Sequence, residues 1–229
     1  MLESKDIVKT YGKKAAVDHF SLTLEEGHIY GMLGPNGSGK STWMKMVSGL
    51  IVPDRGEIRY NDDIVGIETK KQVAYMSTEP FFYSYMKIKD VGKYYRDFFE
   101  DFDMEVFESL LKRMELDPEL KVRTLSSGMA AKLKIAATMA RHAKVYLLDE
   151  PFNGIDLLAR DQIVSMILER FDDDCIMVIS SHMVEELEKI IDSAVFMKNG
   201  SLVLAGDVEQ IRAERGKSIA DLYREIYTA

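Results

Sequence analysis

The octapeptide GPNGSGKS, Gly34 to Ser41, constrains this 229-residue chain more than any other stretch. It follows the G-x-x-x-x-G-K-[ST] pattern and stands between the apolar run HIYGML and a helical pattern from Ser41 to about Leu50. Its glycines let backbone N–H groups turn inward onto phosphate oxygens, and the helix that follows adds the partial positive charge of its N-terminus. A strand, a glycine-rich turn and a helix in this order predict an α/β fold that binds phosphate. A glycine-rich turn that binds nothing is the alternative, and the flanking elements count against it.

The residues of this loop are expected to take different parts in nucleotide binding. The Lys40 ammonium would reach the β- and γ-phosphates, and the Ser41 hydroxyl would ligate Mg²⁺. The predicted nucleotide-binding residues of the loop and the first helical turn are Gly34, Pro35, Asn36, Gly37, Ser38, Gly39, Lys40, Ser41 and Thr42.

An acidic pair lies in VYLLDEP, where an apolar strand pattern ends in Asp149 and Glu150 follows. Ligands of open α/β sheets bind at the carboxyl ends of the strands, so Asp149 is suited to hold Mg²⁺ through water. Glu150 is the candidate general base that activates the attacking water. Two acids that merely end a strand in solvent are the alternative. Together with the phosphate loop, the pair favours an ATPase or a GTPase.

The remaining patterns predict one domain with an insertion. Short apolar runs alternate with turns up to about residue 80, and strand and helix patterns alternate again after residue 143. Between them, from Phe81 to Arg141, the apolar residues follow helical spacing. Alternating strands and helices predict a largely parallel sheet covered on both faces. We therefore expect a single domain over 1–229, with a core formed by 1–80 and 144–229 and a helical subdomain at 81–143.

Charge and hydrophobicity limit which partners and which cellular location are expected for the protein. A net charge of −8 and a pI near 5.2 make the surface repel polyanions, so no nucleic acid is expected as a partner. No apolar run approaches the ~18 to 20 residues needed to span a bilayer, and the N-terminus lacks the apolar core of a secretory signal. We expect a cytoplasmic protein that contacts a membrane only through a partner.

The stretch TLSSGMAAK begins a further helical pattern ahead of VYLLDEP. A phosphate loop, a helical insertion ending in this serine-glycine signature, and LLDEP in that order resemble the nucleotide-binding subunit of ATP-binding cassette (ABC) transporters over nearly the whole chain. The resemblance implies a P-loop NTPase core with N-terminal antiparallel strands, and ATP with Mg²⁺ as cofactors. It also implies a head-to-tail pair with a second ABC ATPase subunit, identical or related, in which Ser126, Ser127 and Gly128 act on the partner's ATP. A serine N-cap before an ordinary helix is compatible with this role.

Further residues take roles by the same resemblance. Tyr11 in KTYGKK matches the aromatic residue that stacks on adenine, although a strand tyrosine by itself is more often a packing residue. Asp156 in FNGID matches the aspartate of the loop along the dimer seam and is also suited to cap a helix. His182 matches the switch histidine that contacts the γ-phosphate and the attacking water. The expected catalytic residues are therefore Glu150, His182 and Lys40, with His182 as organiser and Glu150 as base.

Two positions depart from the family pattern. Thr78, in VAYMSTEP, stands where the family usually has glutamine. Its hydroxyl is too short to reach Mg²⁺ as the amide would, so either a water intervenes or Glu79 turns in as an extra carboxylate, and Thr78 is only a weak metal ligand. Ser127 stands where glycine is common and Met129 where glutamine is common. The retained Gly128 still permits a close approach.

These expectations describe the ATP-binding and hydrolysing subunit of an ABC transporter, peripheral on the inner face of the membrane through integral membrane permease subunits, with export favoured over import. The permease contact is expected at Thr78 to Met86, whose aromatic residues either receive a short helix from the permease or pack the helical insertion. Two alternatives stay open. One is a soluble ABC ATPase with an assembly role, and the other is a small phosphoryl-transfer kinase.

Overall fold

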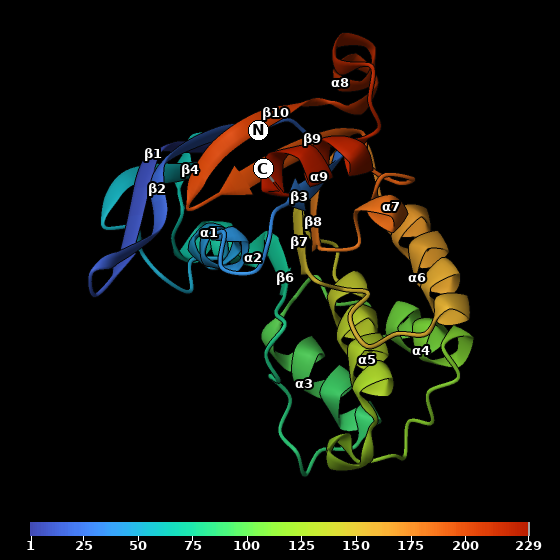
Figure 1. Ribbon diagram of the computed structural model, residues 1–229. Helices are drawn as coiled ribbons and strands as arrows, with labels where there is room; N and C mark the ends of the chain where they lie inside the picture. Colours follow the sequence, from blue (N-terminus) through green and yellow to red (C-terminus); the bar gives the residue numbers. More distant parts are fainter. Residues whose placement is uncertain (229) are drawn as a thin grey trace.

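Two β-sheets frame the molecule in the computed structural model, which describes residues 1–228 without the side chains of residues 157 and 158 (Figure 1). The first is a four-stranded sheet in the order β2-β1-β4-β5, and its neighbouring strands are antiparallel. Its strands are β1 (Leu2–Tyr11), β2 (Lys14–Leu24), β4 (Arg55–Tyr60) and β5 (Asp63–Ile64). The N-terminal antiparallel strands that the resemblance implies are confirmed.

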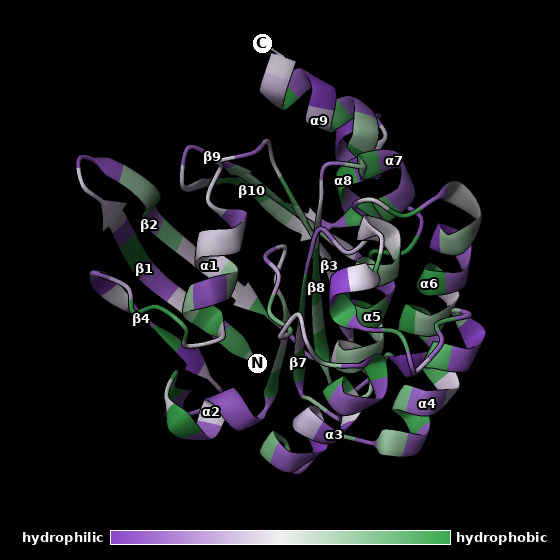
Figure 2. Cartoon of the chain, turned by 90° about the horizontal axis from the view of Figure 1, so that it is seen from below, coloured by the Kyte–Doolittle hydropathy of each residue, from purple (hydrophilic) through white to green (hydrophobic). Residues whose placement is uncertain are grey.

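The second sheet has six strands in the order β10-β9-β3-β8-β7-β6. Its neighbours pair in parallel, except that β10 is antiparallel to β9. The strands are β3 (His28–Leu33), β6 (Val73–Met76), β7 (Val145–Asp149), β8 (Ile176–Ser181), β9 (Ser193–Lys198) and β10 (Ser201–Asp207). Every residue of β7 and β8 is buried, as expected for parallel strands covered on both faces. Figure 2 shows the apolar residues gathered on β3, β7 and β8 in the interior. The predicted mainly parallel sheet is confirmed.

The strand order determines which candidate functional residues lie next to one another. Strand β3 runs into the loop of residues 34–39 and then into α1 (Lys40–Val47), and β8 lies between β3 and β7. The carboxyl ends of parallel strands share one edge of the sheet. The phosphate loop, Asp149 and the residues after Ser181 are therefore neighbours, although they are far apart in the sequence.

Helix α1 is anchored between the two sheets by Trp43, which is fully buried and donates a hydrogen bond from Nε1 to Ser4 Oγ at 3.0 Å. Its ring contacts Phe20 of β2 with centroids 6.2 Å apart. The helix that follows the phosphate loop is thus tied to the antiparallel sheet.

Helices occupy the segment between β6 and β7, where the sequence predicts helical spacing. They are α3 (Ile88–Phe98), α4 (Met104–Arg113), the 3-10 turn Val122–Thr124 and α5 (Ser127–Met139). In Figure 1 these helices lie on one side of the molecule, below the sheets. They pack on one another through buried apolar side chains, among them Ile88, Val91, Phe107, Leu110, Leu111 and Leu133.

The remaining helices cover the sheets. They are α2 (Ile67–Lys71), α6 (Leu157–Arg170), α7 (Val184–Leu187), α8 (Val208–Arg215) and α9 (Ile219–Thr228). The Tyr227 hydroxyl of α9 lies 3.2 Å from the Leu33 carbonyl oxygen and 3.0 Å from that of Met197, so α9 is docked at the ends of β3 and β9, beside the start of the phosphate loop. Within residues 1–228, we find no helix with both the length and the apolar character that a membrane crossing requires.

Candidate active site

The phosphate loop turns tightly because its glycines take conformations closed to other residues. Gly37 and Gly39 have φ of 79° and 114°, in the left-handed region that side chains rarely adopt. A Cβ on Gly39 would lie 2.4 Å from the carbonyl oxygen of Ala16, whereas a Cβ on Gly37 would meet nothing within 4 Å. The loop is therefore packed against β2 at one end and open at the other, as a cradle for an anion must be.

Lys40 begins α1 with its side chain buried under the loop. It is 6% exposed, and its ammonium donates to the carbonyl oxygens of Gly34 at 2.7 Å and Pro35 at 3.2 Å. Burial lowers the pKa of the Lys40 amine, and the negative charges of Glu150 and Asp149 oppose that shift. A triphosphate would offer this ammonium stronger, charged acceptors.

Asp149 ends β7 and is 1% exposed. Its Oδ1 accepts a hydrogen bond from Ser180 Oγ at 2.6 Å, and Ser180 Oγ in turn accepts from the Glu150 N–H at 3.0 Å. The Tyr75 hydroxyl lies 3.5 Å from Asp149 Oδ2, and burial together with the charge of Asp149 raises the pKa of the Tyr75 phenol. Ser180 and Tyr75 were not predicted from the sequence. Only their places on β8 and β6, the two neighbours of β7, point to them.

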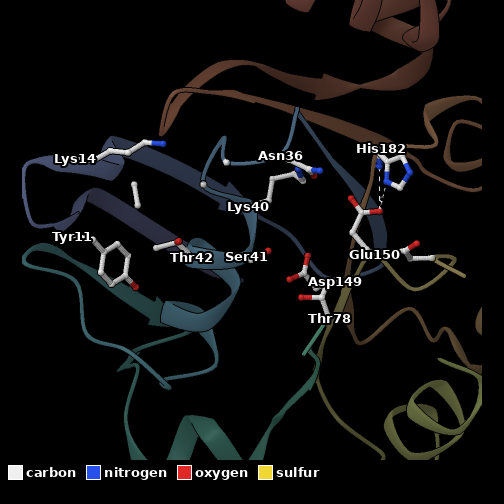
Figure 3. A pocket seen from close by; sticks show the side chains of 14 residues that line it. Tyr11, Lys14, Asn36, Lys40, Ser41, Thr42, Thr78, Asp149, Glu150 and His182 are labelled. Atoms are coloured by element: carbon white, nitrogen blue, oxygen red, sulfur yellow. Dashed lines mark hydrogen bonds and ion pairs between the residues drawn. The ribbon is translucent and has the colours of Figure 1, made fainter. Parts of the chain in front are cut away.

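Glu150 has a backbone conformation that is unusual for a residue other than glycine, with φ of 51°. Its N–H donates to both the carbonyl oxygen and the hydroxyl of Ser180, which hold this conformation. Glu150 Oε2 accepts a hydrogen bond from His182 Nδ1 at 2.8 Å, drawn as a dashed line in Figure 3. Glu150 Oε1 is buried and has no partner among the described residues. A carboxylate with one oxygen held and the other free to accept is suited to act as a general base.

These groups share one cleft of about 490 Å³ (Figure 3). Of the residues predicted from the sequence, it is lined by Tyr11, Asn36, Gly37, Gly39, Lys40, Ser41, Thr42, Thr78, Asp149, Glu150 and His182. Three predicted loop residues lie outside this lining: Gly34 and Ser38 are buried within the loop, and Pro35 is exposed. Lys14, Ala16 and Asn153 also line the cleft and were not predicted. Lys14 could have been predicted from its position in the hairpin of β1 and β2, where it pairs with Tyr11.

Tyr11 lies at the rim of the cleft, in Figure 3 on the side away from Glu150 and His182. It is 54% exposed, whereas a strand tyrosine that packs the interior is covered. Its ring is therefore available to a ligand. An exposed aromatic face at the end of a phosphate-binding cleft can stack on a base.

Thr78 lies on the cleft wall with Ser41 and Asp149 (Figure 3). Glu79 does not line the cleft: its Oε1 accepts a hydrogen bond from Lys45 Nζ of α1 at 2.8 Å, and its side chain is 69% exposed. Of the two ways considered for completing a metal site, this arrangement favours Thr78 acting through a water over a Glu79 carboxylate.

The signature lies outside the residues that line the nucleotide cleft. Ser126 caps α5, its Oγ accepting from the Met129 N–H at 3.2 Å. A Cβ on Gly128 would lie 2.9 Å from the carbonyl oxygen of Gly154, so this glycine permits the loop before α6 to come close. Ser127 lines an adjoining cavity of about 310 Å³, which shares Thr78, Asp149, Glu150 and Asn153 with the nucleotide cleft. Asp156 caps α6, its Oδ1 accepting from the Ala159 N–H at 3.0 Å.

The residues of the cleft fit a nucleoside triphosphate with a divalent cation. Among the described residues, Ser38 Oγ and Glu150 Oε1 are buried polar atoms without a hydrogen-bond partner. The same part of the chain holds no cluster of three His, Cys, Asp or Glu side chains that would bind a metal ion by itself. Ser41, and Asp149 and Thr78 through water, would hold a cation together with phosphate oxygens, since oxygen atoms are the ligands suited to Mg²⁺.

Comparisons with known proteins agree with this geometry. The family described as ABC transporter matches residues 17–153. The ABC transporter ATP-binding protein YtrB of Bacillus subtilis (strain 168) is 29% identical over 221 residues, which cover 93% of this chain and 74% of that protein. The linearmycin resistance ATP-binding protein LnrL of the same organism is 30% identical over 215 residues, which cover 90% of this chain and 69% of that protein. A solved ATP-binding subunit of an ABC transporter superposes with a TM-score of 0.88 at 27% identity, covering 98% of both chains.

Proposed function

Since this chain belongs to the ABC transporter family and is one of its ATP-binding and ATP-hydrolysing subunits, we propose that it drives export through separate integral membrane permease subunits. The observation that carries the ATP-hydrolysing part of the proposal is the pairing of Glu150 with His182 in the same cleft as Lys40 and the phosphate loop. The direction of transport is supported by the name of one relative, the SkfA peptide export ATP-binding protein SkfE of Bacillus subtilis (strain 168).

In the proposed site each group has one task. The loop N–H groups and Lys40 would bind the phosphates, Tyr11 would stack on adenine, and Ser41 and Asp149, with Thr78 through a water, would hold Mg²⁺. Bound Mg²⁺ supplies positive charge that neutralises the phosphate oxygens. Glu150 Oε1 takes the proton of the attacking water, while His182 Nδ1 holds Oε2 and so fixes the orientation of the carboxylate.

We also propose that ATP joins two copies, or one copy and a related subunit, head to tail. The first turn of α5 presents unsatisfied backbone N–H groups and the positive end of the helix dipole at Ser126 to Gly128, outside the cleft of its own chain. A partner's γ-phosphate would bind there only while ATP is intact. In this arrangement the chain is one domain, with a core of 1–80 and 144–229 and a helical subdomain at 81–143, and Asp156 lies along the dimer seam.

The proposed permease contact is the aromatic surface formed by Phe81, Tyr83, Tyr85 and Phe98, whose side chains are between 36% and 69% exposed. Tyr83 stacks on Tyr85 at 5.5 Å, so the surface is preassembled. Phe82 instead packs into the insertion against Tyr95. An exposed aromatic surface is the kind of site that receives an amphipathic helix. This contact would hold the protein on the cytoplasmic face of the membrane. The proposed function involves no nucleic acid as a partner.

The test is affinity purification of the tagged protein from detergent-solubilised membranes of its own cell with ATP present, compared with the Tyr83→Ser/Tyr85→Ser variant. We expect a polytopic membrane protein in stoichiometric amount with the wild type and less of it with the variant. A purely soluble complex would assign the chain to an assembly role instead. ADP release that requires an added acceptor would identify a kinase.

A further inference from the structure

Lys134, on the second turn of α5 after the signature, makes an unusual set of hydrogen bonds. Its ammonium donates to three successive backbone carbonyl oxygens, at 3.0 Å to Ser77, 2.9 Å to Thr78 and 2.7 Å to Glu79. A lysine has three N–H donors, so all of them are committed to this one segment. The ring centroid of Phe81 lies 5.3 Å from the same nitrogen.

The segment Ser77–Glu79 connects β6 of the core to the helical insertion, and it includes Thr78 on the cleft wall. It is tied on its other side to α1, through the ion pair of Glu79 with Lys45. That pair is largely exposed, and exposed pairs contribute little to stability. The three charge-assisted bonds from Lys134 all reach the backbone of this segment, within which the Glu79 N–H also donates to Ser77 Oγ at 3.1 Å.

The surroundings of Lys134 also set it apart from an ordinary surface lysine. It lines the cavity of about 310 Å³ together with Thr78, Ser127, Asp149 and Glu150. Burial lowers the pKa of its amine, and the negative charges of Glu79 and Asp149 oppose that shift. One cation on the signature helix thus lines the same cavity as Ser127 of the signature and the two acids at the end of β7.

We propose that Lys134 is a positioning residue for ATP hydrolysis, whose ammonium fixes Ser77–Glu79 against α5 so that the Thr78 side chain stays on the cleft wall beside Ser41 and Asp149. Threonine has a short, β-branched side chain, and rotation about the single Cα–Cβ bond places its hydroxyl oxygen. The position of the hydroxyl therefore follows the position of the backbone. Without the three donors, the backbone would be free to move and the hydroxyl with it. The inference rests on the proposed function, because it assigns Thr78 to the Mg²⁺ side of that site.

The test is the ATPase rate as a function of Mg²⁺ concentration for Lys134→Met, which removes the donors and keeps an unbranched side chain only one atom shorter. We expect the Mg²⁺ concentration for half-maximal rate to rise about tenfold, the loss typical of removing a partner that orients a metal ligand. Nucleotide affinity measured in EDTA should not change, because the phosphate loop is intact. The matched control is Lys132→Met, a lysine of the same helix whose ammonium donates only at 3.4 Å to the Met114 carbonyl oxygen. It should behave as the wild type in both measurements.

A double-mutant cycle with Thr78→Val shows whether Lys134 acts through Thr78. If it does, the double variant needs no more Mg²⁺ than the worse single variant, whereas multiplying effects would overturn the proposal. Should Lys134→Met fold poorly, Lys134→Gln replaces it, because a shorter, uncharged amide side chain offers at most two N–H donors. An active wild type together with an unshifted Lys134 variant refutes this inference alone. A wild type without Mg²⁺-dependent ATPase activity refutes the proposed function and the inference with it.

Discussion

Replacing Ser180 with alanine removes one buried hydroxyl that holds both acids of the site. Ser180 is fully buried, donates to Asp149 Oδ1 at 2.6 Å and accepts from the Glu150 N–H at 3.0 Å. The Glu150 N–H keeps a second acceptor, the Ser180 carbonyl oxygen at 3.1 Å. The carboxylate of Asp149 has no comparable substitute within the described residues, because its other contact is the Tyr75 hydroxyl at 3.5 Å.

The expected loss of folding stability in Ser180→Ala follows from the lost hydrogen bond to the buried Asp149 carboxylate. Hydrogen bonds to charged groups contribute about 1.5 to 3 kcal/mol, and a change of about 2 kcal/mol lowers the Tm of a chain of this size by about 4 to 8 °C. Asp149 also loses the contact that orients it, so the Mg²⁺ concentration for half-maximal ATPase rate should rise about tenfold.

The assay pairs thermal unfolding with the Mg²⁺ dependence of ATP hydrolysis, and Ser4→Ala is the matched control. Ser4 is also a buried serine, but its hydroxyl accepts a neutral bond from Trp43 Nε1, and neither residue lines the cleft. Ser4→Ala should cost about 1 kcal/mol and leave the Mg²⁺ dependence unchanged. Equal losses of Tm in the two variants, with no change in Mg²⁺ dependence, would refute the role given to Ser180.

Three further substitutions test the cleft itself. Lys40→Ala should abolish nucleotide binding, measured by equilibrium titration, because it removes the buried ammonium of the loop. Glu150→Gln should lower the hydrolysis rate by about 10²- to 10⁴-fold and trap an ATP-dependent dimer, seen by light scattering; a wild-type rate would exclude Glu150 as the base. Tyr11→Ala should weaken ATP binding by about 2- to 10-fold while Tyr11→Phe keeps the affinity, since the ring and not the hydroxyl stacks on adenine; equal losses would point to the hydroxyl instead.

The sequence predicts the cleft well where the residues belong to a local pattern. The phosphate loop and the acidic pair are recognised because neighbouring residues act together and strand edges follow from apolar runs. Ser180, Tyr75 and Lys14 were missed because each enters the site through pairing with another strand, which depends on register and strand order. Glu79 shows a second limit: its ion pair with Lys45 depends on how β6 passes α1, so the sequence alone left both ways of completing the metal site open.

The positions of Lys134 and Ser126 on one helix suggest a physical link between the two anion-binding regions of the chain. Eight residues separate them, which is about 12 Å along an α-helix. Lys134 holds the cleft wall of its own chain, while Ser126 begins the signature that would face the partner's ATP. Coupling between the cleft and the signature is established by a measurement in which a change at Lys134 alters the dimer that the signature forms.

The ATP-dependent dimer of Glu150→Gln provides that measurement. Adding Lys134→Met should raise the protein concentration needed for dimer formation, because α5 would no longer be held at a fixed position relative to the cleft. Nucleotide binding by the separate chains should be unchanged, since Lys40 and the loop are untouched. An unaltered dimer would mean that the tie of Lys134 serves only the cleft of its own chain, and that the signature is positioned by the packing of α5 on α3, α4 and α6.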